Sequence, residues 1–308
     1  MISNPVIQWL LEGDISIQYQ VFRDLLNSEK PNFRKRISTE GWGKELLSRR
    51  LPNGHWGRSF YQPKWTSSHY TLLELKNLDI NPLLPEIRQT LDLIIGYEKC
   101  ADGGIHPIST IKHSDVCLNG MFLNYAAYFG ASEGQIESVI DFLISQQMKD
   151  GGFNCNSNMK GAIHSSLHTT LSVLEGILEY SRNGYTYRLS ELQQMANESV
   201  EFILQHRLYK SDKTGEIIDE KFTRFSYPCR WRYDVLRALD YFQDAKITYD
   251  RRMDDAIELL LKKRTSERKW LLQAKHPGQT HFDMEIPGRP SRWNTFRAMR
   301  IIRNFEFE

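Results

Sequence analysis

The sequence has few cysteines, almost no net charge and no long hydrophobic run. Its four cysteines, among 308 residues, are too few and too scattered for a disulfide framework. The 40 basic and 38 acidic residues leave a net charge of +2, which argues against nucleic acid as the main partner, because that binding relies on clustered Lys and Arg. No stretch approaches the roughly 20 apolar residues that a membrane-spanning helix needs.

The first residues lack the basic and apolar regions of a signal peptide, so we expect a cytoplasmic protein. A peripheral membrane contact stays open, since it needs only an exposed apolar rim or one amphipathic helix. Apolar residues make up 40% of the chain and charged residues 25%, which is typical of a globular protein.

What the sequence does contain is a repeated segment, in which a polar or aromatic pair runs into an apolar helix. Six copies begin at Gln18, His69, His113, His168, Arg232 and Arg292, with spacings of 51, 44, 55, 64 and 60 residues. A repeat of this size is one helical hairpin, which buries its apolar face only by stacking on its neighbours. No linker interrupts the series, so we expect a single domain over residues 1–308.

Each copy is expected to contain an outer helix, a glycine-bearing loop and an inner helix. The patterns predict outer-helix segments over residues 41–47, 91–97 and 139–147, followed by glycine loops at 52–57, 101–105 and 149–153. No strand-like alternation is long enough to compete with this interpretation. The sequence therefore predicts an all-α fold, in which six hairpins form an open solenoid or a closed ring.

The glycine loops resemble those of a known superfamily. Residues 147–153 read Gln-Met-Lys-Asp-Gly-Gly-Phe, and Leu51 to Gly57 is a looser copy. This loop is similar to the one repeated in terpenoid cyclases of the squalene–hopene type and in protein prenyltransferase β subunits. The resemblance covers almost the whole chain and implies an (α/α)6 toroid, with inner and outer helix rings around an apolar cavity. It also implies an isoprenoid or similar apolar small molecule as substrate.

The chain departs from these enzymes where their chemistry takes place. The Asp-x-Asp-Asp motif with which the cyclases protonate an alkene is absent. Residues 252–258 superficially resemble the Asp-Asp-x-x-Asp/Glu magnesium motif of other prenyl enzymes, but the repeat register puts them in an outer helix. An acidic helix start in solvent is the simpler interpretation of that segment.

A zinc site is the second implication of the resemblance. Prenyltransferase β subunits hold zinc with Asp-x-Cys at the start of one inner helix and His at the start of the next. The corresponding positions here hold His113, Asp115 and His168, which would form a two-His, one-carboxylate site. Cys117 is either a fourth ligand or a small core residue. One observation argues against a metal. His69 begins its copy at the same position as His113 and His168, so histidine at a helix start could simply form hydrogen bonds between the loop and the helix. The remaining cysteines are expected to be packed residues: Cys100, Cys155 and Cys229.

Two carboxylates are candidate general acids. Asp115 and Asp234 are each the third residue of their copy, and a carboxyl group kept protonated by apolar surroundings could donate a proton. The alternative is helix capping, in which the carboxylate accepts hydrogen bonds from free backbone N–H groups.

Aromatic and basic residues also gather at the inner-helix starts and are candidate substrate-binding groups. Aromatic rings would line an apolar cavity or stabilise a cation, and arginine would hold an anionic head group. The candidates are Trp65, His69, Tyr70, Arg232, Tyr233, Arg292 and Trp293. Packing between hairpins and an arginine–carboxylate network at the end of the chain would explain the same residues without a ligand.

The sequence thus favours an enzyme or enzyme-like protein that acts on an isoprenoid or other apolar small molecule. Zinc is the one cofactor suggested, and the sequence does not require it. A non-catalytic α/α ring that binds a ligand or a protein is the alternative, and a metal-dependent hydrolase or lyase on a polar substrate is the third hypothesis.

Overall fold

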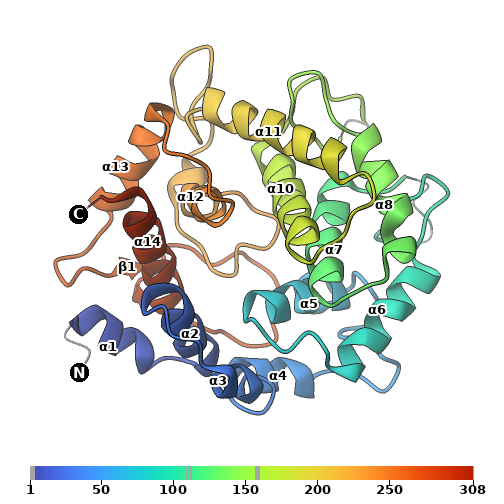
Figure 1. The fold of residues 1–308 in the computed structure, drawn as a ribbon, viewed down its shortest axis with the longest axis horizontal. Helices are drawn as coiled ribbons and strands as arrows, with labels where there is room; N and C mark the ends of the chain where they lie inside the picture. Colours follow the sequence, from blue (N-terminus) through green and yellow to red (C-terminus); the bar gives the residue numbers. More distant parts are fainter. Residues whose placement is uncertain (1–3, 109, 111–112, 157–159, 308) are drawn as a thin grey trace. The chain divides into compact units, whose positions relative to one another are not determined.

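The computed structural model describes residues 4–108, 110, 113–156 and 160–307, which are mostly helical (Figure 1). They divide into two compact units. Unit 1 comprises Met1–Arg49, Asn77–Asn81 and Leu204–Glu308, and unit 2 comprises Arg50–Lys76 and Pro82–Ile203. No helix of the described residues is both long and apolar enough to cross a membrane.

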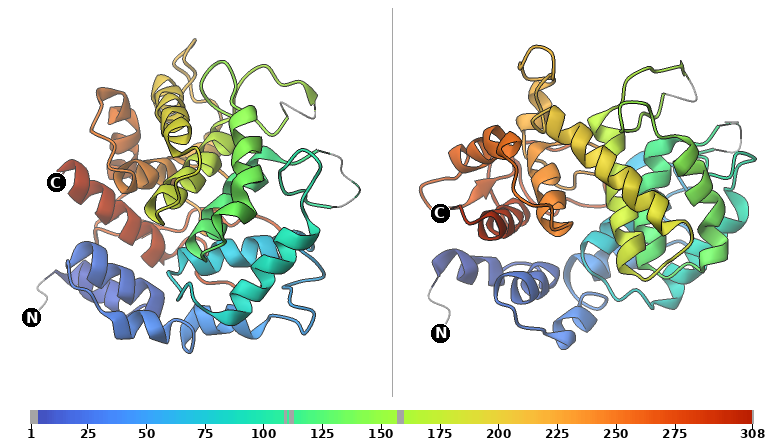
Figure 2. Two further views of the ribbon diagram at one scale, coloured as in Figure 1. Left: turned by 45° about the vertical axis from the view of Figure 1, so that its right-hand side comes forward. Right: turned by 45° about the horizontal axis from the view of Figure 1, so that its top comes forward.

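Unit 2 contains three of the predicted loop-and-helix copies. Its helices are α5 (Ser68–Asn77), α6 (Pro85–Tyr97), α7 (Val116–Tyr128), α8 (Glu133–Ser145), α10 (Leu167–Arg182) and most of α11 (Leu189–Gln205). Helices α7 and α10 lie side by side, with α8 next to α7 (Figures 1 and 2). Every residue of α7 is buried, because this helix is apolar all round and is enclosed by its neighbours.

Two glycines allow α7 and α10 to touch through their backbones. A Cβ atom on Gly176 would lie 2.4 Å from the carbonyl oxygen of Gly120, and one on Gly120 would lie 2.7 Å from the backbone nitrogen of Val173. Both distances are shorter than any ordinary carbon contact, so a larger residue would force the helices apart. This close approach brings the starts of the two helices together.

The Asp-Gly-Gly loop has a definite structural role. The Asp150 carboxylate accepts hydrogen bonds from the backbone nitrogen of Ser165, at 2.8 Å, and from its hydroxyl, just before α10. Gly151 has a φ of +87°, and a Cβ there would lie 2.9 Å from the carbonyl oxygen of Glu198 in α11. The loop therefore joins the following inner helix to the following outer helix.

The preceding copy uses the same arrangement. Asp102 accepts from the backbone nitrogen and the hydroxyl of Ser114, and a Cβ on Gly103, with φ of +91°, would lie 2.8 Å from the carbonyl oxygen of Ser138. In four copies the backbone nitrogen after the loop donates to a side chain of the next inner helix. The pairs are Trp56–Ser68, Ile105–Asn119, Phe153–Thr170 and Trp270–Thr295. The sequence repeat is therefore also a repeat of structure.

Unit 1 combines the beginning and the end of the chain. Its helices are α1 (Pro5–Leu11), α2 (Ile15–Gln20), α3 (Pro31–Arg36), α4 (Gly41–Ser48), α12 (Val235–Asp244), α13 (Asp254–Lys262) and α14 (Arg292–Phe305). Arg303 donates to the carbonyl oxygens of Asp24 and Leu25, at 2.8 and 3.0 Å. The Arg292 guanidinium lies 4.6 Å from the centre of the Trp9 ring. The last helix thus packs on the first helices of the chain.

A buried ion pair joins α12 to α14. Arg297 Nε donates to Asp240 Oδ2 at 2.8 Å, and the two side chains are only 9% and 19% exposed. Arg297 also donates to Cys229 Sγ at 3.4 Å. Charged groups this deep in a protein need partners, since an isolated buried charge is costly.

The predicted helices are confirmed where the described residues cover them. The segment 41–47 lies in α4, 91–97 lies in α6, and 139–147 overlaps α8, which ends at Ser145. The acidic segment 252–258 runs from a 3₁₀ turn into α13; Asp254 is exposed, and the half-buried Asp255 pairs with Lys210 at 2.7 Å.

Two details differ from the sequence prediction. The fold is not strictly all-α, because β1 (Trp270–Leu271) and β2 (Pro290–Ser291) form a small antiparallel sheet with Trp270 opposite Ser291. The helix of the first copy, α2, starts at Ile15, three residues before Gln18, because the Asp14 carboxylate accepts from the backbone nitrogen of Ser16 at 2.9 Å and caps α2 there.

Candidate functional site

The strongest candidate site lies at the start of α7 in unit 2. Asp115 is the N-cap residue of this helix, and its Oδ1 accepts a hydrogen bond from the backbone nitrogen of Leu118 at 2.9 Å. Its Oδ2 has no hydrogen-bond partner among the described residues. Cys117 is in the first turn of the same helix and is buried. The helix thus holds a carboxylate and a thiol side by side.

A second thiol approaches from the loop after the Asp-Gly-Gly motif. Cys155 Sγ accepts a hydrogen bond from the backbone nitrogen of Cys117 at 3.2 Å and donates one to Asp115 Oδ1 at 3.2 Å. Its own backbone nitrogen donates to the Thr169 hydroxyl in α10 at 3.3 Å. On the other side, the Cys117 thiol donates to the Ser172 hydroxyl at 3.5 Å. The contact between α7 and α10 therefore positions both thiols.

These three side chains form a potential metal-ligand group. One carboxylate oxygen of Asp115 and the sulfurs of Cys117 and Cys155 all lie within 4.8 Å of one another. Among the described residues, no other group of three or more His, Cys, Asp or Glu side chains converges in this way. Two thiolates and a carboxylate are ligands that suit zinc, and three protein ligands leave one position of a tetrahedral ion open. The donor set thus fits zinc.

The same crowding changes the acidity of Cys155. The hydrogen bond with Cys117, burial, and the negative charges of Cys117 and Asp115 all raise the pKa of the Cys155 thiol above its usual range. Without a cation nearby, the Cys155 thiol therefore resists ionisation.

A cluster of aromatic rings lies close to this group. The hydroxyls of Tyr61 and Tyr70 are 3.1 Å apart, and Tyr70 packs edge-on against Trp65 with ring centres 4.8 Å apart. Burial raises the pKa of Tyr61, and the negative charges of Asp115 and the two cysteines raise it further, because these groups are neighbours. Tyr61 is half-buried and Tyr70 is fully buried. Two of the predicted substrate-binding residues, Trp65 and Tyr70, thus belong to this cluster.

His69 is enclosed by the same rings. It makes edge or tilted contacts with Phe60, Tyr61, Tyr70 and Tyr125, and its Nδ1 lies 3.2 Å from the Tyr125 hydroxyl. Burial lowers its pKa to about 3, and the charge of a nearby lysine adds to this effect. His69 is therefore neutral at physiological pH, and its role is to pack and to hydrogen-bond within the cluster.

The two other predicted metal ligands lie outside the ligand group. His113 is exposed in the loop before α7, and His168 is the second residue of α10 and half-buried. The structure brings Asp115 together with two cysteines. Cys117 was predicted to be either a further ligand or a small core residue, and Cys155 was predicted to be a packed residue. The signal for Cys155 was its place two residues after the Asp-Gly-Gly-Phe loop, next to the copy that begins at His168.

The second predicted acid, Asp234, belongs to unit 1 and caps α12. Its Oδ1 accepts from the backbone nitrogen of Arg237 at 2.8 Å, and its Oδ2 accepts from that of Ser226 at 3.4 Å. Burial raises its pKa, whereas the nearby charge of Arg297 and these hydrogen bonds act in the opposite direction. Both of its carboxylate oxygens thus accept hydrogen bonds from backbone nitrogens of unit 1, as helix capping requires.

The remaining predicted substrate-binding residues also lie in unit 1, and most have structural contacts. Arg292 donates from Nε to the carbonyl oxygen of Trp9 at 3.1 Å, and Tyr233 donates to that of Leu208. The Trp293 ring stacks on two others, those of Trp42 and Tyr227, at centre distances of 6.3 and 4.7 Å. Arg232 is half-buried, and its guanidinium lies 4.8 Å from the centre of the Trp231 ring.

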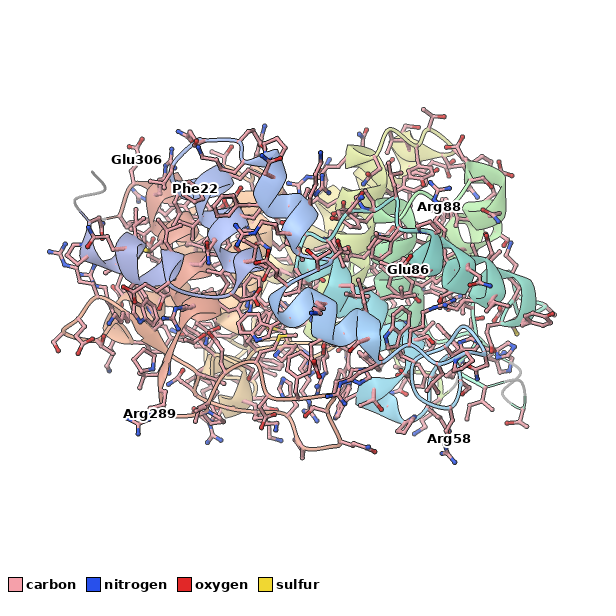
Figure 3. All side chains as sticks on the ribbon, turned by 90° about the horizontal axis from the view of Figure 1, so that it is seen from below. Phe22, Arg58, Glu86, Arg88, Arg289 and Glu306 are labelled. Carbon is pink, nitrogen blue, oxygen red and sulfur yellow. The ribbon has the colours of Figure 1, made fainter. Side chains whose placement is uncertain are left out.

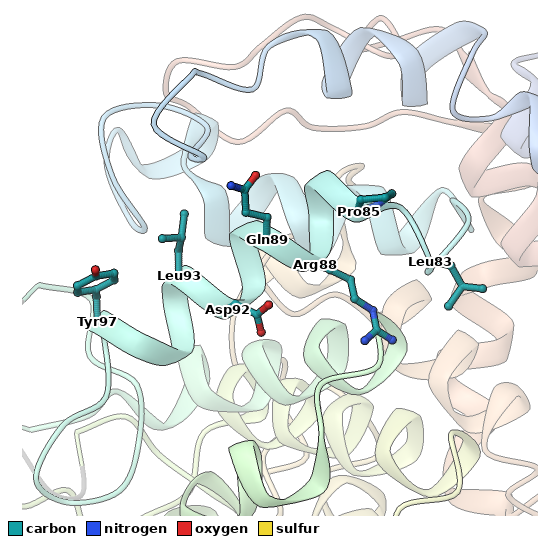
Figure 4. A pocket seen from close by; sticks show the side chains of 7 residues that line it. All are labelled: Leu83, Pro85, Arg88, Gln89, Asp92, Leu93 and Tyr97. Carbon is teal, nitrogen blue, oxygen red and sulfur yellow. The ribbon is translucent and has the colours of Figure 1, made fainter.

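An open groove of about 600 Å³ runs along α6 in unit 2 (Figure 4). It is lined by Leu83, Pro85, Arg88, Gln89, Asp92, Leu93 and Tyr97. Leu83 and Tyr97 are 68% and 77% exposed, and Arg88, labelled in Figure 3, is exposed as well. The lining contains no thiol and no imidazole, so the groove offers less chemistry than the start of α7.

Comparison with known proteins does not add to this geometry. No known protein-family model matches the chain, and no curated protein is similar enough to count as a match. The relation to terpenoid cyclases and prenyltransferase β subunits therefore stays a prediction from the loop motifs.

Proposed function

We propose that this chain binds zinc through Asp115, Cys117 and Cys155 and acts on an isoprenoid or other apolar small molecule. The observation that carries the metal site is the convergence of one carboxylate oxygen and two sulfurs within 4.8 Å of one another, and the substrate class rests on the resemblance of the Asp-Gly-Gly loops. Zinc held by three protein ligands supplies an open coordination position, at which it polarises or activates a bound group.

The chain's own residues would contribute orientation and an apolar wall. The hydrogen bond from Leu118 to Asp115 Oδ1, at 2.9 Å, would hold the carboxylate in place beside the two sulfurs. The rings of Trp65 and Tyr70 are buried and would form the apolar wall behind a bound molecule, and Tyr61, half-buried, would present its hydroxyl there. Rings of this kind suit a hydrocarbon chain or a developing cation.

The proposal includes the (α/α)6 toroid as the arrangement of the six copies. Its support is the repeated loop geometry, which recurs in both units, and the packing of α14 on the first helices of the chain. A closed ring requires such a contact between its last and first hairpins, whereas an open solenoid leaves its two ends apart.

Elemental analysis tests the metal site. Protein purified without added metal or a His-tag should contain close to one zinc per chain. Cys117→Ser, Cys155→Ser and Asp115→Asn should each weaken binding by at least tenfold, because each removes or neutralises one ligand. Cys100→Ser is the matched control, since Cys100 is also a half-buried cysteine outside any disulfide but lies outside the ligand group. Absence of metal, or equal zinc content in all four variants, would mean that the assignment is wrong.

Titration with farnesol, an uncharged isoprenoid alcohol, tests the substrate class. Saturable quenching of tryptophan fluorescence is expected, because Trp65 packs on Tyr70 in the aromatic cluster where farnesol is proposed to bind. The variant Tyr61→Ala should weaken binding, whereas Arg58→Ala, a change at an exposed residue of the same loop, should not (Figure 3). Failure of wild-type protein to bind farnesol, while it still binds zinc, would reject the isoprenoid alcohol and retain the metal site.

A further inference from the structure

The thiols of Cys117 and Cys155 are close enough to react with each other. Their sulfurs lie within 4.8 Å, and Cys155 Sγ is 3.2 Å from the backbone nitrogen of Cys117. Since an N–Cα bond measures about 1.46 Å, this sulfur lies within about 4.7 Å of Cys117 Cα. A disulfide needs the two sulfurs about 2.05 Å apart. From this starting point, a change of side-chain rotamer at the cysteines would bring the sulfurs to that distance.

The surroundings permit such a movement. Cys117 is fixed in the first turn of α7, whereas Cys155 lies in a loop outside the helices and is half-buried. Both residues are free thiols in this structure. The other two cysteines have different surroundings, because Cys100 lies at the start of the preceding glycine loop and Cys229 is buried in unit 1.

We propose that Cys117 and Cys155 form a reversible disulfide and that this bond and the metal exclude each other, so that the redox state of the pair controls metal binding. The exclusion rests on the proposed function, because it requires both sulfurs to be metal ligands. The disulfide itself requires only the two thiols.

The oxidant would be a low-molecular-weight disulfide, for which oxidised glutathione is the probe. One cysteine thiolate attacks a glutathione sulfur, the glutathione S–S bond breaks, and one glutathione thiolate leaves. The second cysteine attacks the mixed disulfide and releases the second glutathione. Two cysteine thiols become one protein disulfide, one oxidised glutathione becomes two reduced glutathiones, and the two cysteine protons pass to the glutathione thiolates.

Zinc should oppose this reaction by mass action. A metal that binds the dithiol form and not the disulfide shifts the equilibrium by the factor one plus the ratio of free metal to Kd. The midpoint of oxidation is the value of the concentration of oxidised glutathione, divided by the square of that of reduced glutathione, at which half of the protein carries the disulfide. Free zinc at 100 times its Kd should raise this midpoint about 100-fold.

The experiment uses the full chain, equilibrated in glutathione buffers with and without saturating zinc. Samples are acid-quenched and alkylated, and the peptide that joins Cys117 to Cys155 is quantified by mass spectrometry. The disulfide should form in the metal-free protein, and zinc should shift its midpoint about 100-fold at the stated saturation. Asp115→Asn keeps both thiols, so the disulfide should still form, while the shift at the same free zinc should fall at least tenfold. Cys100→Ser should behave as the wild type does.

The possible results separate the two proposals. If no Cys117–Cys155 peptide appears at any glutathione ratio, or if the two cysteines carry only glutathione, the disulfide inference is overturned even where zinc binds. If the disulfide forms and zinc leaves its midpoint unchanged, metal control is overturned together with the metal site, and the reactive thiol pair stands.

Discussion

Gly176 offers the most direct test of the contact between α7 and α10. In Gly176→Ala, the new Cβ would lie 2.4 Å from the carbonyl oxygen of Gly120. An ordinary carbon–oxygen contact needs roughly 1 Å more, and since the neighbour is backbone, relief requires a shift of a whole packed helix. Overpacking of this kind costs about 3 kcal/mol at the upper end of its usual range, and alanine returns about 1 kcal/mol of helix propensity. The free energy of unfolding should therefore fall by about 2 kcal/mol.

Gly134 supplies the control, because it lies in α8 and an added Cβ there meets no atom within 4 Å. Gly134→Ala should gain up to about 1 kcal/mol from helix propensity alone, so the two variants should differ by about 3 kcal/mol. Urea denaturation followed by circular dichroism measures both. The displaced α7 should also weaken zinc binding, because Cys117 moves away from Cys155. A Gly176→Ala protein as stable as Gly134→Ala would show that the helices are not in backbone contact, and the geometry of the proposed metal site would lose its basis.

Two further predictions concern buried charge. His69 has an ordinary pKa of about 6.5 when unfolded and about 3 when folded, so the unfolded chain binds the extra proton, and stability falls as pH drops below about 6.5. At pH 4.5 the loss should be about 3 kcal/mol relative to pH 7.5, and urea denaturation of His69→Phe should lack this component; an equal pH dependence in both proteins would contradict it. Arg297→Met should lower the free energy of unfolding by about 3–5 kcal/mol, because it leaves Asp240 without its closest cation in a buried site. Adding Asp240→Asn should recover part of that loss, and a double variant no better than the sum of the single ones would refute the pairing.

The sequence predicted the helices and loops well, because these depend on local patterns. The repeat pattern of helix and glycine loop located α4 and α6, and the Asp-Gly-Gly motif predicted loops whose carboxylates, as the structure shows, hold Ser114 and Ser165. The two-residue strands were not predictable, since a pairing of Trp270 with Ser291 has no periodicity of its own.

The candidate site was predictable only in part. Asp115 and Cys117 are two residues apart at the start of one helix, so their proximity follows from the sequence. Cys155 is 38 residues from Cys117, and the two meet because glycines allow α7 and α10 to touch. Distances of that kind depend on tertiary packing, which a motif does not encode. Asp234 illustrates the converse, because its helix-start position is compatible with both catalysis and capping, and only the hydrogen bonds reveal the cap.

The division of the chain has a consequence for its synthesis. Unit 2 is nearly continuous in sequence, whereas unit 1 needs residues 1–49 together with 204–308. At a translation rate of about 5–20 residues per second, the first 49 residues would wait roughly 8–30 s before position 204 is even added. Unit 2 is free to form in that interval, while the N-terminal helices lack the covering that α14 gives them in the finished protein. A ribosome that stalls late in the message would therefore leave the N-terminal helices as the part most open to chaperones and proteases.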